Sequence, residues 1–105
     1  MNVLHQIIER KKEEVAAAKS KIPVSQFKNS EFFHRENLSL KESLKAKSGI
    51  IAEFKRKSPS KGLINGEADV LEVTKSYENF GASGISVLTD SDFFGGSVQD
   101  VLTIR

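Results

Sequence analysis

The chain has 105 residues, of which 38% are hydrophobic and 29% are charged, with a formal net charge of +2 at pH 7. This length allows the core of one small domain. The mild positive charge suits an anionic small molecule and does not require nucleic acid as a partner. No apolar run approaches the ~20 residues that a membrane helix needs, and the first residues lack the apolar core of a signal peptide. We therefore expect a cytoplasmic protein that does not contact a membrane.

The composition also argues against metal chemistry. The chain has no cysteine, which excludes a disulfide framework and thiolate metal ligands. Its two histidines, His5 and His34, lack the spacing of paired metal ligands. We therefore expect no metal site.

The first 48 residues are expected to form helices. Apolar residues at near-helical spacing predict an amphipathic helix from Asn2 to Ser20, with Asn2 as its N-cap and Pro23 limiting its extension. Residues 24–35 contain three phenylalanines, which we expect to pack as a lid or plug. Ser39 then begins a second helix, 40–47, with a capping box.

A short strand is expected next, over residues 50–54. Its residues are strand formers, and Gly49 and Pro59 bound the segment. Both faces begin with apolar side chains, which is typical of a parallel strand covered by helices on both sides. The polar pair Glu53 and Lys55 then lies at the carboxyl end, where parallel α/β folds place their chemistry.

Glu53 and Lys55 share one face of this strand, about 6.5 Å apart along it. At that spacing a carboxylate and an ammonium reach one small substrate or each other. A catalytic pair and a structural ion pair therefore both fit the pattern.

The remaining sequence predicts a βαβ unit. Residues 58–66 are rich in Ser, Pro and Gly and are expected to be a loop that holds an anion. Asp69 caps a helix that ends near Gly81, and a second strand, 85–89, follows Gly84. The spacing of the two strands fits parallel pairing. Ser97 is expected to cap a last helix, 98–105.

The run from Ile51 to Gly62, with Glu-x-Lys followed by Ser-Pro-Ser, closely resembles the signature of the indole-3-glycerol phosphate synthase family. The resemblance continues through the second predicted strand and the loop after it, residues 81–97, and the first 48 residues are similar to the helical extension of that family. The fold it implies is α/β, the N-terminal part of a (β/α)8 TIM barrel, with residues 1–48 as a helical extension and 49–105 as about two βα units. A whole barrel takes about 200 to 250 residues, so this chain cannot close one.

The resemblance implies a carbon–carbon lyase of tryptophan biosynthesis. The family closes the indole ring of 1-(2-carboxyphenylamino)-1-deoxyribulose 5-phosphate with loss of carbon dioxide and water, and it uses no cofactor. If the roles of the family's residues are transferred to this chain, Lys55 is the cation that holds the substrate anion. Glu53 then acts as an acid or base, or orients the lysines. Ser58 is expected to hydrogen-bond a substrate anion, and Phe94 either stacks on the anthranilate ring or packs in its loop.

The family places its general-acid lysine on the third strand, a further carboxylate on the fifth, and its phosphate loops near the last two. The 105 residues alone are therefore expected to be inactive, with a tendency to self-associate or to pair with the missing remainder of a barrel. Two alternatives remain at this point. One is a non-catalytic basic module that uses Lys55, Arg56, Lys57 and Lys61 for nucleic acid or a protein partner, and the other is a different phosphate-binding barrel.

Overall fold

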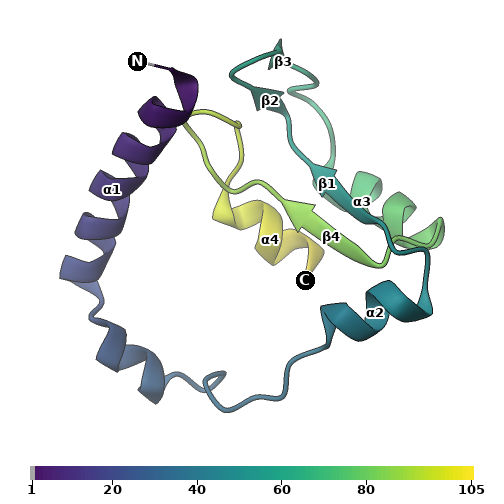
Figure 1. Ribbon diagram of the computed structural model, residues 1–105, viewed down its shortest axis with the longest axis horizontal. Coiled ribbons are helices and arrows are strands. Elements are labelled where there is room, and N and C mark those ends of the chain that lie inside the picture. Colours follow the sequence, from purple (N-terminus) through teal and green to yellow (C-terminus); the bar gives the residue numbers. More distant parts are fainter. Residues whose placement is uncertain (1) are drawn as a thin grey trace. The chain divides into compact units, whose positions relative to one another are not determined.

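The computed structural model describes residues 2–105, and the chain divides into two compact units, 1–38 and 39–105 (Figure 1). None of the helices in the described part of the chain combines the length and apolar character needed to cross a membrane. We describe each unit by itself.

The first unit is helical. Helix α1 spans Val3–Lys21, and the Asn2 side chain accepts a hydrogen bond from the backbone N–H of His5, which confirms the predicted N-cap. Charged pairs one turn apart line α1, as in the 2.7 Å contact between Lys11 and Glu14. After Pro23 the chain forms a short 3₁₀ helix, η1, over Val24–Asn29. Phe27 lies in η1, whereas Phe32 and Phe33 lie in the turns that follow it, and the expected packing of this segment as a lid or plug stays a prediction.

Helix α2, Leu40–Ala46, belongs to the second unit. The Ser39 hydroxyl accepts from the Glu42 backbone N–H, which confirms Ser39 as the N-cap of this helix. Ser43 donates to the carbonyl of Ser83 over 2.5 Å, which ties α2 to the start of a strand. The compact units thus divide at residue 38, whereas the predicted boundary at residue 48 rests on the family resemblance and stays a prediction.

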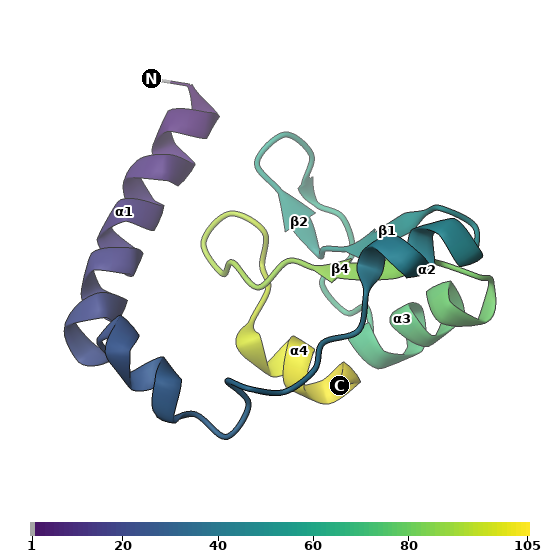
Figure 2. The same ribbon diagram turned by 60° about the horizontal axis from the view of Figure 1, so that its bottom comes forward.

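The centre of the second unit is a βαβ arrangement (Figure 2). Strand β1, Ile51–Phe54, pairs in parallel with β4, Gly84–Val87, and helix α3, Val70–Asn79, connects them. The Asp69 carboxylate accepts two backbone N–H groups at the start of α3, and Gly81, with φ of +92°, follows its end. The parallel pairing, the cap and the helix are as the sequence predicts.

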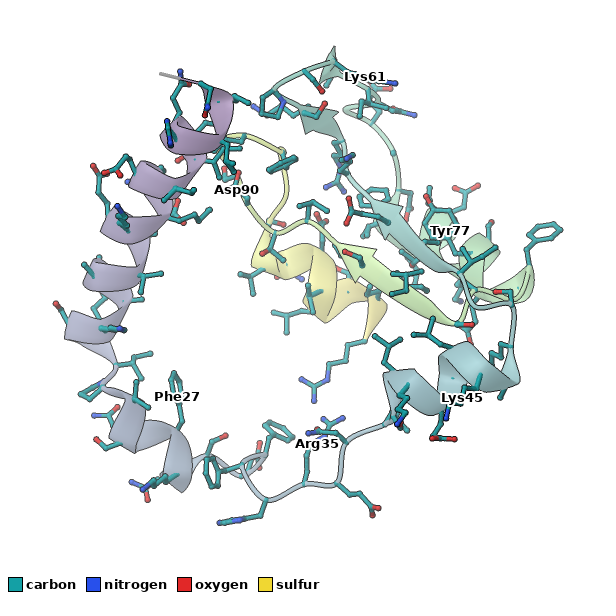
Figure 3. The ribbon with its side chains drawn as sticks, viewed as in Figure 1. Phe27, Arg35, Lys45, Lys61, Tyr77 and Asp90 are labelled. Atoms are coloured by element: carbon teal, nitrogen blue, oxygen red, sulfur yellow. The ribbon has the colours of Figure 1, made fainter. Side chains whose placement is uncertain are left out.

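The segment after β1 differs from the expected loop. Strand β2, Lys57–Ser58, pairs antiparallel with β3, Gly62–Leu63, so residues 57–63 form a small hairpin, and Figure 3 shows Lys61 at its tip. Gly62 has φ of +66°, a conformation that glycine adopts without strain. Two-residue strands carry no usable side-chain periodicity, which is why the pattern indicated only a loop.

Helix α4, Val98–Ile104, completes the unit. The Ser97 hydroxyl accepts from the Asp100 backbone N–H, which confirms the predicted cap. Helices α3 and α4 pack against each other and lie on the same side of the two strands (Figure 2). One face of the sheet is therefore covered by helices from this chain.

The other face is open, and the expectation that β1 is buried on both faces is wrong for these 105 residues. Phe54, toward the helices, is 4% exposed, whereas Ile51, on the opposite face, is 50% exposed. The reason is that α2 reaches this face only at the start of β4, where Leu40 lies over Gly84, and no other element of the unit covers it. Among the described residues, Phe54 and Val70 are the apolar side chains that count as buried, which is a small core.

A second apolar surface lies along the outer edge of β1. A hollow of about 390 Å³ is lined by residues that include Ile50, Ala52, Tyr77 and Phe80. The Phe80 side chain is 91% exposed. The unit therefore leaves both a strand edge and adjoining apolar side chains without cover.

We predict that the isolated 105-residue chain self-associates or melts without a cooperative transition. A two-stranded sheet is marginal in water, and unpaired strand edges favour pairing with other chains. Sedimentation velocity and a thermal melt followed by circular dichroism measure both properties. A monomer with a sharp, cooperative melt would contradict the prediction.

Candidate active site

The candidate site is built at the carboxyl end of β1. Glu53 is the third residue of the strand and Lys55 follows its last residue, so both side chains leave the same face. The Lys55 Nζ lies 3.5 Å from Glu53 Oε1. The two side chains are 38% and 45% exposed, so the pair remains open to a ligand. The predicted pair therefore exists as an accessible ion pair.

The loop after β4 brings an aromatic ring to this pair. The Asp90 carboxylate accepts the backbone N–H groups of Phe93 and Phe94, over 2.7 and 3.3 Å, which folds the loop into a tight turn (Figure 3). The Lys55 Nζ lies 5.9 Å from the centre of the Phe94 ring, within the range of a cation–π contact. Lys55 thus contacts both Glu53, on its own strand, and Phe94, on a separate loop.

A close backbone approach fixes the same loop. The Gly96 N–H donates to the Asp90 carbonyl over 2.7 Å. A Cβ at position 96 would lie 1.8 Å from the Leu88 carbonyl oxygen, so the turn has no room for a side chain there. This close approach explains why the loop carries glycine at position 96, two residues after Phe94.

Ser58 lies in β2, and its hydroxyl is engaged within the hairpin. The Ser58 Oγ accepts the Lys61 backbone N–H over 3.2 Å and lies 3.4 Å from the Ser60 Oγ. The residue is 7% exposed. The structure therefore brings Glu53 and Phe94 each into contact with Lys55 and gives Ser58 a turn-forming role, while its contact with a substrate anion stays a prediction.

The sequence did not predict two hydrogen bonds that Glu53 accepts at this end of the sheet. Ser86 of β4 lies opposite Glu53 in the parallel register and donates from its Oγ to Glu53 Oε2 over 2.9 Å. Tyr77 of α3 donates from its hydroxyl to the Glu53 carbonyl over 3.3 Å (Figure 3). The alternation of side chains along each strand indicates which residues share a face. It does not indicate which residue of one strand lies opposite which residue of the other.

Arg56 and Asp100 form a further contact that the sequence did not predict, a bidentate ion pair. The Arg56 guanidinium donates to the two carboxylate oxygens of Asp100 over 2.6 and 3.1 Å. Their side chains are 20% and 11% exposed, and the guanidinium also lies 5.0 Å from the Phe54 ring centre. The hydrogen bonds lower the pKa of the Asp100 carboxyl and raise the pKa of Arg56. The pair ties the end of β1 to the first turn of α4.

Comparison with known proteins identifies the family. The family model described as indole-3-glycerol phosphate synthase matches residues 4–105. The chain is 45% identical over 105 residues to the indole-3-glycerol phosphate synthase of Bacteroides thetaiotaomicron, covering 99% of this chain and 40% of that protein. It is 39% identical over 110 residues to the protein of the same name from Carboxydothermus hydrogenoformans, covering 97% and 42% respectively.

The chain belongs to the indole-3-glycerol phosphate synthase family. This confirms the resemblance carried by the Glu-x-Lys and Ser-Pro-Ser run. The chain spans about two-fifths of the length of these relatives. Tests of function therefore need residues 1–105 joined to the rest of a synthase sequence, from its own gene or from the B. thetaiotaomicron relative, which we call the completed enzyme.

We predict that Asp100→Asn destabilises the completed enzyme. The change leaves the Arg56 charge without its partner, which costs about 1–3 kcal/mol for a largely buried hydrogen-bonded group, or several degrees in melting temperature. Because the pKa of Asp100 is lowered on folding, its contribution is fully present above the ordinary value of 3.8 and is lost as the pH falls through the folded value.

The measurement is a series of thermal melts from pH 7 down to about pH 3. The gap between wild type and Asp100→Asn should be largest near neutral pH and should shrink at the acid end. Glu78→Gln, an exposed carboxylate on α3, is the matched control and should leave the melting temperature almost unchanged. Equal stability of wild type and Asp100→Asn at pH 7 would show that the ion pair does not stabilise the fold.

Proposed function

We propose that residues 49–105 are the first two βα units of a (β/α)8 barrel and that residues 1–48 are its helical extension. The parallel β1–β4 pair with an intervening helix supports this, because a barrel of this kind repeats that unit. The open face of the sheet and the uncovered edge of β1 are then the surfaces that the remaining units cover. The barrel also explains why polar side chains gather at the carboxyl end of β1.

We propose further that the completed enzyme is an indole-3-glycerol phosphate synthase of the cytoplasm, acting in tryptophan biosynthesis. It closes the indole ring of 1-(2-carboxyphenylamino)-1-deoxyribulose 5-phosphate. The observation that carries this proposal is the cluster of Glu53, Lys55 and Phe94 at the strand ends. The substrate is an aromatic ring that bears a carboxylate, and a cation beside an aromatic face suits both parts of it.

The reaction determines the role of each group. A new carbon–carbon bond joins the ring carbon that bears the carboxylate to the carbonyl carbon of the ribulose chain. The carbonyl oxygen takes a proton, carbon dioxide leaves the ring, and the new hydroxyl leaves as water. Lys55 holds the ring carboxylate and neutralises it as the two carbons approach. Glu53 carries protons or aligns Lys55, and Phe94 stacks on the ring.

Ser58 is proposed to donate its hydroxyl proton to a substrate anion. Its Oγ accepts the Lys61 N–H within the hairpin, and a serine hydroxyl keeps one donor besides its acceptor positions. Lys61, at the hairpin tip in Figure 3, adds positive charge nearby in the chain. The general-acid lysine and the phosphate loops of the family are expected from the part of the enzyme beyond residue 105.

The ion pairs also weigh against a basic module that binds nucleic acid. Of the four cations in the Lys55 to Lys61 run, Arg56 is held in a largely buried ion pair with Asp100, and Lys55 lies beside the carboxylate of Glu53. A phosphate-tracking surface depends on free cations. The same pairs are useful to an enzyme, because they hold charged groups in fixed positions.

We predict that Lys55→Met lowers kcat/KM of the completed enzyme by about 10²- to 10³-fold, the usual cost of removing one preorganised donor. Glu53→Gln should lower kcat by about 10²- to 10⁴-fold, the usual contribution of a proton-transfer group. Both side chains are exposed, so the fold should survive. Steady-state kinetics of ring closure, with melts of each variant, measure these effects.

Lys45→Met is the matched control, because Lys45 lies on α2, away from the strand ends that carry the site (Figure 3). Its kinetics should match those of the wild type. Wild-type kcat/KM in both Lys55→Met and Glu53→Gln would refute the proposed roles. Absence of ring closure in the wild-type completed enzyme would refute the proposed function itself.

A further inference from the structure

Ser86 is the one side chain of β4 that touches the acidic member of the candidate site. Its Oγ donates to Glu53 Oε2 over 2.9 Å, while Lys55 Nζ lies 3.5 Å from the other oxygen, Oε1. The two contacts therefore hold opposite corners of one carboxylate. A carboxylate held at both oxygens has a defined rotation about its last side-chain bond, which a single contact would leave broad.

The register of the two strands determines the position of Ser86 relative to Glu53. Glu53 and Ser86 are direct partners in the parallel ladder, and the neighbouring pairs Ala52 with Ile85 and Phe54 with Val87 hold the same register. The Tyr77 hydroxyl donates to the Glu53 carbonyl, so the backbone at this residue is held from α3 as well. Glu53 is thus fixed through its main chain and its carboxylate by two different elements.

We propose that Ser86 is a positioning residue that acts through Glu53. This rests on the proposed function, in which Glu53 carries protons or aligns Lys55. The serine hydroxyl is both a donor and an acceptor. It donates to Glu53 when the carboxylate is charged, and after rotation it accepts from the carboxylic acid when Glu53 holds a proton. Ser86 therefore maintains the same geometry through both halves of a proton-transfer cycle.

The chemistry requires this kind of support. Proton transfer needs the donor and acceptor atoms at hydrogen-bond distance from the substrate, and small misplacement lowers the rate steeply. Glu53 is 45% exposed, so the protein surface around it does not restrict its side chain by packing. The hydrogen bond from Ser86 and the contact with Lys55 restrict the side chain instead.

The test compares Ser86→Ala in the completed enzyme with the wild type. We expect kcat to fall by about 10- to 100-fold, the size of one hydrogen bond to a charged group, with little change in KM. Ser86→Thr keeps the hydroxyl on a residue that suits a strand, and it should recover most of the lost kcat. Ser86→Cys, which has nearly the same shape and only a weak donor, should behave like Ser86→Ala and serves if the alanine variant folds poorly.

The decisive arm places Ser86→Ala in a Glu53→Gln background. Because Ser86 acts through the Glu53 carboxylate, the serine change should then have almost no further effect on kcat. Ser76→Ala, an exposed serine on α3 whose hydroxyl donates to its own helix, is the matched control and should keep wild-type kinetics.

Two results would overturn the inference. One is wild-type kcat in both Ser86→Ala and Ser86→Cys while Glu53→Gln is impaired, which leaves the proposed function intact. The other is a full additional loss in the Glu53→Gln background, which would mean that Ser86 contacts the substrate itself. Failure of the proposed function gives a different pattern, because Glu53→Gln and Lys55→Met would then match the wild type.

Discussion

The parallel register of β1 with β4 is the constraint on which the rest of the second unit depends. Side chains alternate faces along a strand, so a shift of one residue would turn Ser86 away from Glu53 and exchange the covered and open faces of β4. In the observed register Phe54 lies toward the helices, and Glu53 and Lys55 lie on the open face. The pairing thus decides at once which side chains form the small core and which remain available for chemistry.

The Arg56 and Asp100 ion pair extends this order beyond the strands. The Arg56 carbonyl accepts the backbone N–H groups of Ile64 and Asn65, which return from the hairpin, while its guanidinium holds α4 through Asp100. The next residue, Lys57, donates its N–H to the Phe94 carbonyl over 3.4 Å. Residues 56 and 57 therefore connect the end of β1, the hairpin and the Phe94 loop. These hydrogen bonds fix the backbone next to Lys55, the exposed cation of the site.

Local signals in the sequence predicted the helices well. Asn2, Ser39, Asp69 and Ser97 each accept a backbone N–H at a helix start, as capping chemistry requires. The two long strands and their parallel pairing also followed from apolar runs separated by one helix. The caps depend on neighbouring residues, and the parallel pairing follows from the order of strand, helix and strand along the chain, so a single sequence contains enough information to predict both.

The sequence did not predict specific side-chain contacts between residues that are far apart in the chain. Arg56 and Asp100 are 44 positions apart, and nothing in their local sequence indicates a contact. The Ser86 contact with Glu53 depends on register, which apolar runs of four residues leave open. The hairpin within residues 57–63 is too short to show alternation. Glu53, Lys55 and Phe94 were predicted together because the family resemblance supplied the long-range information that residue patterns lack.

The central claim is that Glu53 and Lys55 act as one unit on one substrate. A double-mutant cycle with Glu53→Gln and Lys55→Met, measured as kcat/KM of ring closure in the completed enzyme, tests it most directly. If the two residues act together, the double variant should be about as active as the less active single variant, because the first change already disables the pair. Losses that multiply in the double variant would show that the two residues act independently and would contradict the account.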